Sequence, residues 1–325
     1  MPVIFSTHPL HPNVTARLAA AGTFRVASEP TAPAIMAEGL DADVLIVRAH
    51  IPPDYFAAAP RLRAAIRHGA GLDMIPMQAA TDAGVLVSNV PGANAVTVAE
   101  HTIFSAIALR RQFRAMDTAL RSNGWNAARA YSDVGRDLSG ATLGVLGMGN
   151  IGRKITQMAQ SAFGMHVITT TRSANNLPIG VRAVELNALA KQADVLVLCC
   201  PLTADTRGAI SAERIAMMPP HAVLINVSRG PVVDTDALIA ALSQRKILGA
   251  ALDVFDHQPL PADSPLYGMN NVILTPHMAG ITADSMLRLG EQAADDAIAV
   301  LGNGLPKHVC NPEVTPAYRA RFPAP

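Results

Sequence analysis

A glycine-rich turn constrains the fold of this chain more than any other feature. Residues 141–152, ATLGVLGMGNIG, place Gly147, Gly149 and Gly152 directly after an apolar run that reads as a buried strand. In a dinucleotide site the first glycine permits a tight turn, the second lets a pyrophosphate approach the backbone, and the third lets a helix pack on the strand. We therefore predict that a dinucleotide binds here, with its phosphates at the helix N-terminus.

The residues around this turn supply the context that the motif needs. A helical pattern runs from Ile151 to Ala162, and the side chains expected on its buried face are Ile151, Ile155, Met158, Ala159 and Ala162. Further strands are predicted downstream at Val167–Thr170, Val195–Cys199, Val223–Asn226, Gly249–Val254 and Val272–Leu274. Helical segments separate them, which is the rhythm of a doubly wound parallel sheet.

The first hundred residues form an α/β pattern of their own. Short apolar runs alternate there with helical or proline-marked segments, and they occupy Val3–Phe5, Val44–Val47, Ala64–Ile66 and Val85–Val87. The chain is expected to cross into the second pattern within residues 89–101. A last helix is predicted from Thr282 to Leu301, followed by a proline-rich tail over residues 311–325.

Composition excludes several classes of function. The chain has 325 residues and a formal net charge of +1, without a strongly basic or acidic segment, so nothing indicates nucleic acid or a charged membrane surface. The apolar run at residues 195–200 is far too short to span a bilayer, and the N-terminus lacks the features of a signal peptide. A cytoplasmic protein is expected.

Three cysteines at 199, 200 and 310 make neither a disulfide framework nor a zinc spacing, and no metal site is predicted.

Several ordered motifs together resemble a known family. They are VLGMGNIG, then INVSRGPVVD at 225–234, ALDVFDHQPLP at 251–261 and LTPHMAG at 274–280, with support from RHGAGLDMI at 67–75 and NVPGANAVTVAEH at 89–101. Over nearly its whole length the chain resembles the D-isomer-specific 2-hydroxyacid dehydrogenases. The resemblance implies an α/β fold of two Rossmann-like, doubly wound parallel-sheet domains with the active site in the cleft between them. Residues 1–97 and 285–325 would form the substrate domain, and residues 98–284 the dinucleotide-binding domain.

The resemblance gives two residues catalytic roles that their chemistry supports. Arg229, in VSRG, matches the arginine that holds a 2-oxo acid, because its fork of donors fits a carboxylate and a carbonyl oxygen. His277, in TPHMAG, matches the general acid and base, because imidazole can protonate the alkoxide that hydride transfer produces.

The third catalytic position departs from the usual pattern. Most relatives have glutamate before the proline that follows the Asp-Val-Phe run, and this chain has Gln258. A carboxylate beside His277 would raise the imidazole pKa, whereas an amide can orient the ring but adds no charge. Formate dehydrogenases of the same superfamily also use glutamine here. We expect Gln258 to orient His277.

Further site residues are implied by the resemblance. Residues 67–73 resemble a carboxylate-binding turn in which Ala70 and Gly71 offer backbone N–H groups, while Arg48 could add a positive charge and Asn94 matches a substrate-side loop residue. Asp253 matches the residue that contacts the nicotinamide carboxamide. The other cofactor contacts implied by the resemblance are Asn150, Ile151, Cys200, Pro201, Thr206, Val227, Ser228, His277 and Gly280.

The end of the second strand of the dinucleotide pattern indicates which nicotinamide cofactor binds. Sites that prefer NAD carry an acidic residue there, bonded to the ribose 2′-hydroxyl. No Asp or Glu occurs between Asp137 and Glu185, and the strand ends instead in Thr171, Arg172 and Ser173. Arg172 can pair with a 2′-phosphate and the two hydroxyls can bond to it. We therefore favour NADP(H), with NAD(H) as the alternative.

The predicted function is reduction of a small 2-oxo acid, such as glyoxylate or hydroxypyruvate, by an NADP(H)-dependent oxidoreductase. One alternative is a dehydrogenase of another small anion, formate or phosphite, which Gln258 motivates. Another is a nucleotide-sensing protein on the same fold, against which the presence of Arg229 and His277 argues. The family resemblance implies a homodimer formed through the cofactor domain, with Trp125 near the partner subunit.

Overall fold

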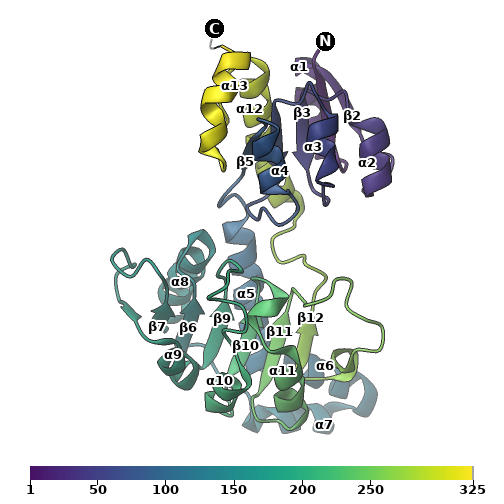
Figure 1. The fold of residues 1–325 in the computed structure, drawn as a ribbon. Helices are drawn as coiled ribbons and strands as arrows, with labels where there is room; N and C mark the ends of the chain where they lie inside the picture. Colours follow the sequence, from purple (N-terminus) through teal and green to yellow (C-terminus); the bar gives the residue numbers. More distant parts are fainter. Residues whose placement is uncertain (324–325) are drawn as a thin grey trace. The chain divides into compact units, whose positions relative to one another are not determined.

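The computed structural model describes residues 1–323, which form two compact α/β units. Unit 1 comprises Met1–Asn94 and the residues from Ile281 onward, and unit 2 comprises Ala95–Gly280 (Figure 1). The units divide at 94/95 and 280/281, compared with the predicted boundaries at 97/98 and 284/285. Each unit has its own sheet and its own core, so each is described separately.

Unit 1 is built on a five-stranded parallel sheet in the order β2-β1-β3-β4-β5. The strands are β1 Val3–Ser6, β2 Thr23–Val26, β3 Val44–Val47, β4 Ala64–Arg67 and β5 Leu86–Asn89. Strands β1, β3 and β4 are buried on both faces, which explains why they read as continuous apolar runs. The edge strand β2 is largely accessible and less apolar, and it was not predicted.

Helices cover both faces of the unit 1 sheet. One face carries α2 Ala32–Glu38, α3 Asp54–Ala58 and α4 Met77–Asp82, and the other carries α1 Pro12–Ala21, α12 Ala283–Leu301 and α13 Thr315–Arg321. The predicted long helix is therefore present as α12. Within the proline-rich tail, residues 315–321 form α13, a helix that was not predicted, and α13 buries Tyr318 completely against the core of unit 1.

Unit 2 is built on a seven-stranded parallel sheet in the order β12-β11-β10-β9-β6-β7-β8. The strands are β6 Thr142–Leu146, β7 His166–Thr170, β8 Val181–Ala183, β9 Val195–Leu198, β10 Val223–Asn226, β11 Gly249–Leu252 and β12 Val272–Leu274. The two halves of the sheet run outward from the β6–β9 pair. This reversal of strand order is where doubly wound sheets bind their ligands, outside the carboxyl ends of the strands.

The unit 2 sheet is also covered on both faces. Helices α5 Ala95–Arg110 and α8 Asn150–Phe163 share one core with it, while α9 Leu186–Gln192, α10 Ala212–Met217 and α11 Thr235–Ser243 share the other. The fold class, two parallel-sheet α/β domains, is confirmed. On α8 the buried side chains are Ile155, Thr156 and Ala159, whereas Ala162, predicted to be buried, is exposed.

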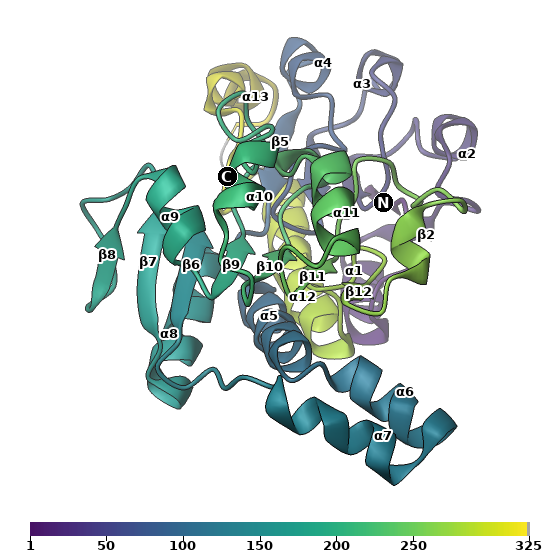
Figure 2. The same cartoon turned by 90° about the horizontal axis from the view of Figure 1, so that it is seen from below.

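Two helices of unit 2 were not predicted. Helices α6 Phe113–Asn123 and α7 Trp125–Arg129 form a hairpin after α5 (Figure 2). The sequence gives no core-facing signal here because α6 buries none of its residues.

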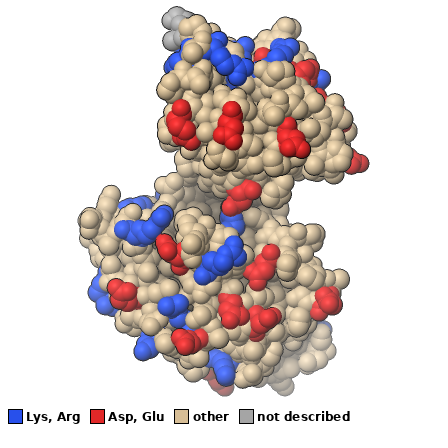
Figure 3. Space-filling view, viewed as in Figure 1, with Lys and Arg blue, Asp and Glu red and all other residues tan. Residues whose placement is uncertain are grey.

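On unit 2, acidic and basic side chains are interspersed over the surface that Figure 3 displays. None of the helices within residues 1–323 combines the length and apolarity needed to cross a membrane.

Candidate active site

The glycine-rich turn lies at the point in unit 2 where the strand order reverses. Gly147 follows β6 with φ of +101°, and a Cβ there would come 2.8 Å from the Cα of Cys200, which follows β9. A side chain at 147 would therefore force the ends of β6 and β9 apart. The structure thus brings Gly147 and Cys200, both predicted cofactor contacts, to one place at the carboxyl edge of the sheet.

The N-terminus of α8 fits a pyrophosphate. A Cβ on Gly152 would lie 2.2 Å from the carbonyl oxygen of Gly147, so only glycine lets the helix sit this close to the turn. A Cβ on Gly149 would meet no atom within 4 Å, which leaves the backbone open to a ligand. Gly149 is also the N-cap residue and supplies no side-chain cap to the first N–H groups of α8. These groups, which include those of Asn150 and Ile151, can bind an anion.

The segment that follows β7 carries three predicted contacts to the adenosine end of the cofactor. Thr171, Arg172 and Ser173 come directly after the carboxyl end of β7, beside β6. Arg172 and Ser173 are exposed, and the amide of Ser173 donates to Oγ1 of Thr171 at 3.4 Å. No acidic side chain occurs in this segment, so a phosphate would meet no fixed negative charge from it.

A buried asparagine positions the loop that carries Arg229. Asn226, at the end of β10, is 1% exposed, and its amide group donates to the carbonyl of Arg229 at 3.0 Å. Its Oδ1 accepts from the amide and the hydroxyl of Ser228, at 3.0 and 2.8 Å. Asn226 was not predicted as a site residue, although a polar residue at the end of an otherwise apolar strand was a usable signal. The guanidinium of Arg229 donates to the carbonyl of Ser228 at 2.7 Å.

The loop that carries His277 is bound to one buried carboxylate. Asp253, just after β11, is 3% exposed and accepts from the hydroxyl of Thr275 at 2.6 Å and from the amides of Met278 and Ala279 at 2.7 and 3.0 Å. Its backbone carbonyl accepts from the amide of His277 at 2.8 Å. These bonds hold His277 at φ of +58°, a left-handed conformation that costs a non-glycine residue about 1 kcal/mol.

Gln258 contacts His277 as predicted from their chemistry. Oε1 of Gln258 lies 3.1 Å from Nδ1 of His277, and the side-chain amide of Gln258 donates to the carbonyl of Phe255 at 3.4 Å. The second bond orients the carbonyl oxygen of the amide toward the imidazole. A hollow of about 450 Å³ adjoins this pair, and its apolar lining includes Phe255, Leu260 and Leu274. The geometry lets Gln258 fix the ring of His277 without a charge.

A single glycine joins the arginine loop to the glutamine loop. A Cβ on Gly230 would lie 2.1 Å from the carbonyl carbon of Phe255 and 2.3 Å from the amide of Asp256, so the two backbones touch. Strands β10, β11 and β12 are neighbours and parallel, so the loops after them share one edge of the sheet. Arg229, Asp253, Gln258 and His277 therefore gather along the carboxyl edge of unit 2.

Unit 1 has a cationic group at its own strand-order reversal, between β1 and β3. The amide of Arg48 donates to Oγ1 of Thr7 at 2.8 Å, and its guanidinium donates to the carbonyl of Pro9 at 2.8 Å. Burial lowers the pKa of His8, and the charges of Arg48 and Arg67 lower it further. Burial with the same two arginines lowers the pKa of His68 to about 3, so His68 is neutral at physiological pH. Sequence analysis assigned no role to His8 or His68.

The turn after β4 is braced by Arg67. Its guanidinium donates to the carbonyls of Gly71, Val47 and His68 at 3.0, 3.0 and 2.9 Å. Within residues 1–323 the amides of Ala70 and Gly71 donate to no protein acceptor, so both remain available to an anion. The turn after β4 therefore presents two adjacent backbone donors, and its role in binding a carboxylate stays a prediction.

The remaining predicted contacts occupy loops at the same edges. Oγ1 of Thr206 donates to the carbonyl of Pro201 at 2.7 Å, which closes the loop after β9. Val227 and Gly280 flank the loops of Arg229 and His277, and Asn94 ends the first segment of unit 1. Across the residues that the structure describes, no three His, Cys, Asp or Glu side chains are grouped to hold a metal ion.

Comparison with known proteins identifies the family. Residues 103–279 match the family model of the D-isomer specific 2-hydroxyacid dehydrogenase NAD binding domain, which is more than half of the chain. The chain belongs to the D-isomer-specific 2-hydroxyacid dehydrogenases. Its residues 103–279 correspond to the NAD binding domain of this family.

Individual relatives differ in substrate. The chain is 36% identical over 316 residues to a D-3-phosphoglycerate dehydrogenase of Methanocaldococcus jannaschii, covering 95% of this chain but only 59% of that relative's length. It is 35% identical over 278 residues to a glyoxylate reductase of Korarchaeum cryptofilum, covering 84% and 83% of the two chains. A solved NADPH-dependent glyoxylate/hydroxypyruvate reductase of Sinorhizobium meliloti, in complex with NADP and malonate, has a TM-score of 0.82 at 27% identity, covering 95% of this chain and 97% of its own.

The close contact at Gly230 gives a first testable prediction. Gly230→Ala should separate the loop of Arg229 from the loop of Gln258, because overpacking of this kind costs about 1–3 kcal/mol. We expect a lower melting temperature and a fall in kcat/KM for 2-oxo acid reduction. Gly268→Ala is the matched control, since a Cβ at 268 meets no atom within 4 Å. Equal behaviour of the two variants would contradict the close contact.

Proposed function

We propose that this protein reduces a small 2-oxo acid to the 2-hydroxy acid with NADPH. The observation that carries the proposal is the group formed by Arg229, Gln258 and His277 on loops after three neighbouring strands. The open amides of the glycine-rich turn and of Ala70 and Gly71 add two places for anionic groups. The similarity to glyoxylate reductases supports a small substrate.

Each residue has a distinct task in the proposed reaction. The amides of Ala70 and Gly71 bind the substrate carboxylate, with Arg48 and Asn94 on the same substrate side. Arg229 binds the carboxylate and the 2-oxo oxygen through its fork of donors and so polarises the carbonyl. NADPH supplies the hydride when it is bound. His277 gives its proton to the oxygen of the former carbonyl, and Gln258 keeps the ring oriented for that transfer.

The nicotinamide end of the cofactor requires residues of unit 2. We propose that Asp253 and Gly280 line this end, and that Cys200, Pro201, Thr206, Val227 and Ser228 line the path toward the glycine-rich turn. Among residues 1–323, Oδ2 of Asp253 accepts one hydrogen bond, from Ala279, which leaves a second lone pair for a carboxamide N–H. Asp253 would then position the loop of His277 and hold the carboxamide together.

The proposal is tested most directly by initial rates with a substrate panel. Glyoxylate, hydroxypyruvate and longer 2-oxo acids are offered with NADPH and with NADH, and formate and phosphite are offered in the oxidative direction. We expect turnover of at least one 2-oxo acid. Turnover of formate or phosphite alone would favour the other dehydrogenase class, and binding of cofactor without any turnover would favour a sensor.

A second substrate class is favoured by the cationic edge of unit 1. Arg48 and Arg67 lie close enough to His8 and His68 to lower the pKa values of both imidazoles, so two positive charges lie near this edge. A 2-hydroxy acid with a second anionic group would use this charge, as the similarity to phosphoglycerate dehydrogenases suggests. The chain spans only 59% of that relative's length. We therefore add 3-phosphoglycerate to the panel as a candidate substrate, offered in the oxidative direction.

Replacing the neutral partner of His277 should move the pH profile. In Gln258→Glu the new carboxylate stabilises imidazolium and should raise the His277 pKa by about one unit or more. Protonated His277 would then persist to higher pH, so keto-acid reduction should extend in the alkaline direction. The measurement is kcat/KM against pH for both proteins. A profile that coincides with that of the unmodified protein would show that Gln258 does not act on His277.

The preference for NADP(H) is proposed on the segment after β7. Arg172 is exposed next to Thr171 and Ser173, and no carboxylate of that segment opposes a 2′-phosphate. Solved relatives that bind NADP or NADPH support this choice.

Arg172→Ala should therefore discriminate between the two cofactors. Loss of a hydrogen bond to a charged group costs about 1.5–3 kcal/mol, which is roughly a tenfold to hundredfold rise in KM for NADPH. KM for NADH should change little, because NADH has no 2′-phosphate. Equal changes in both constants would remove the support for NADP(H).

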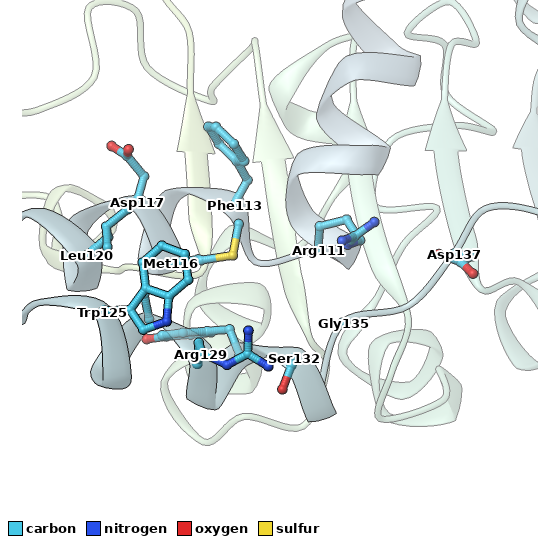
Figure 4. Close-up of a pocket in the computed structure, with 12 residues that line it drawn as sticks. Arg111, Phe113, Met116, Asp117, Leu120, Trp125, Arg129, Ser132, Gly135 and Asp137 are labelled. Atoms are coloured by element: carbon cyan, nitrogen blue, oxygen red, sulfur yellow. The ribbon is translucent and has the colours of Figure 1, made fainter.

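We further propose that the protein forms a homodimer through α5, α6 and α7. Within residues 1–323, five of the eleven exposed large apolar side chains fall in these three helices: Phe104, Ile107, Phe113, Leu120 and Trp125. Phe113, Leu120 and Trp125 also line a hollow of about 550 Å³ on the hairpin (Figure 4). Clustered exposed apolar side chains of this kind mark an interaction surface, and a second copy is the partner that the family expectation supplies.

Charge placed on this surface should dissociate the dimer. Leu120→Arg should give a monomer by light scattering, because a guanidinium cannot be buried there without a partner. Ile179→Arg is the matched control, since Ile179 is 96% exposed and lies outside the hairpin. A mass that is the same for both variants and the unmodified protein would place the interface elsewhere.

A further inference from the structure

Arg153, in the first turn of α8, contacts the loop that follows β7. Its guanidinium donates to the carbonyl oxygen of Asn176. Gln160, seven residues further along α8, donates to the carbonyl of Ile179 at 3.1 Å. Seven residues are about two helical turns, so both side chains belong to one face of α8. The loop therefore runs along this face, from the carboxyl end of β7 toward β8.

The start of that loop and the start of α8 lie at the same edge of the unit 2 sheet. Helix α8 begins after the turn that follows β6, and Arg172 follows β7, the parallel neighbour of β6. In a Rossmann fold the pyrophosphate binds at the helix N-terminus and the ribose 2′-position faces the residues after the second strand. A guanidinium in the first turn of α8 that reaches across to this loop approaches the 2′-position from the helix side.

The donors of both arginines are largely uncommitted. A guanidinium has five N–H donors, and the carbonyl of Asn176 takes one from Arg153. Among the described residues Arg172 makes neither a hydrogen bond nor a salt bridge. No Asp or Glu lies between residues 138 and 184 to compete for them. A phosphate monoester carries about −1.5 to −2 charge near neutral pH and offers three acceptor oxygens, so a single guanidinium leaves part of it unmatched.

We infer that Arg153 and Arg172 together bind the adenosine 2′-phosphate, and that Arg153 also fixes the loop carrying Arg172. The inference rests on the proposed NADP(H) preference and adds to it a specificity residue from α8. Arg153 supplies its remaining donors from the helix side, and Arg172 with Ser173 supplies theirs from the strand side. Its bond to Asn176 ties the loop that carries Arg172 to α8 before the cofactor arrives.

The test measures binding of cofactor fragments, which requires no substrate. Adenosine 2′,5′-bisphosphate and 5′-AMP are titrated by calorimetry into the unmodified protein and into Arg153→Gln. We expect the variant to lose about tenfold or more in affinity for the bisphosphate, because a charge-assisted bond is removed, while the affinity for 5′-AMP stays within about twofold. Glutamine removes the charge but keeps a side-chain N–H donor at this position, and the affinity for 5′-AMP reports whether the rest of the site is intact.

Lys154→Gln is the matched control. It removes the same charge from the neighbouring position, but the ammonium of Lys154 donates to Gln157 at 2.8 Å on the helix itself. It should leave the affinity for both fragments unchanged. An equal loss in both variants would mean a general effect of charge and would overturn the inference.

The two layers of the proposal fail in different ways. If the unmodified protein binds the bisphosphate no more tightly than 5′-AMP, the NADP(H) preference itself is wrong, and the inference falls with it. If the unmodified protein discriminates and Arg153→Gln discriminates equally well, only the role of Arg153 is overturned, and Arg172 remains as the recognition residue.

Discussion

The close approach of backbone to backbone at the reversal point of the unit 2 sheet is the constraint on which the cofactor site depends. The Cα of Gly152 sits so near the carbonyl of Gly147 that a methyl group would come within 2.2 Å of it, and Gly147 is itself pressed against Cys200. These contacts fix how close α8 begins to the end of β6 and in which direction its axis runs. Any side chain there would lift the helix, and with it the free N–H groups that make an anion site.

A second constraint acts on the opposite half of the same edge. One buried carboxylate, that of Asp253, satisfies Thr275, Met278 and Ala279, while its backbone carbonyl binds His277. A buried charge is expensive unless hydrogen bonds compensate it, and three donors do so here. The same bonds hold His277 in a left-handed conformation that it would not adopt alone. The hydrogen bonds of Asp253 therefore both stabilise this loop and place His277, the proposed acid/base residue.

The sequence predicted the parts of the fold whose burial repeats along the chain. Strands β3, β10 and β12 were located to the residue because β3 and β12 are apolar runs with polar residues on both sides, and the apolar run of β10 ends at the polar Asn226. The edge strands β2 and β8 escaped, since they are largely accessible and have no such pattern. Helix α6 escaped for a related reason, because none of its residues is buried in this chain.

The site residues divide in the same way, into residues that a local motif identifies and residues that only the folded chain brings together. Spacing alone was enough to interpret Gly147, Gly149 and Gly152, because each glycine acts within a single backbone turn. Gln258 and His277 are 19 residues apart, and only the fold brings them to 3.1 Å. Asn226 and Arg153 were missed because their importance lies in the backbone carbonyls they bind, at Arg229 and Asn176, and no motif records such contacts. Side chains that hold a loop in place are found from the structure, and their substitution tests the proposed function independently of the catalytic residues.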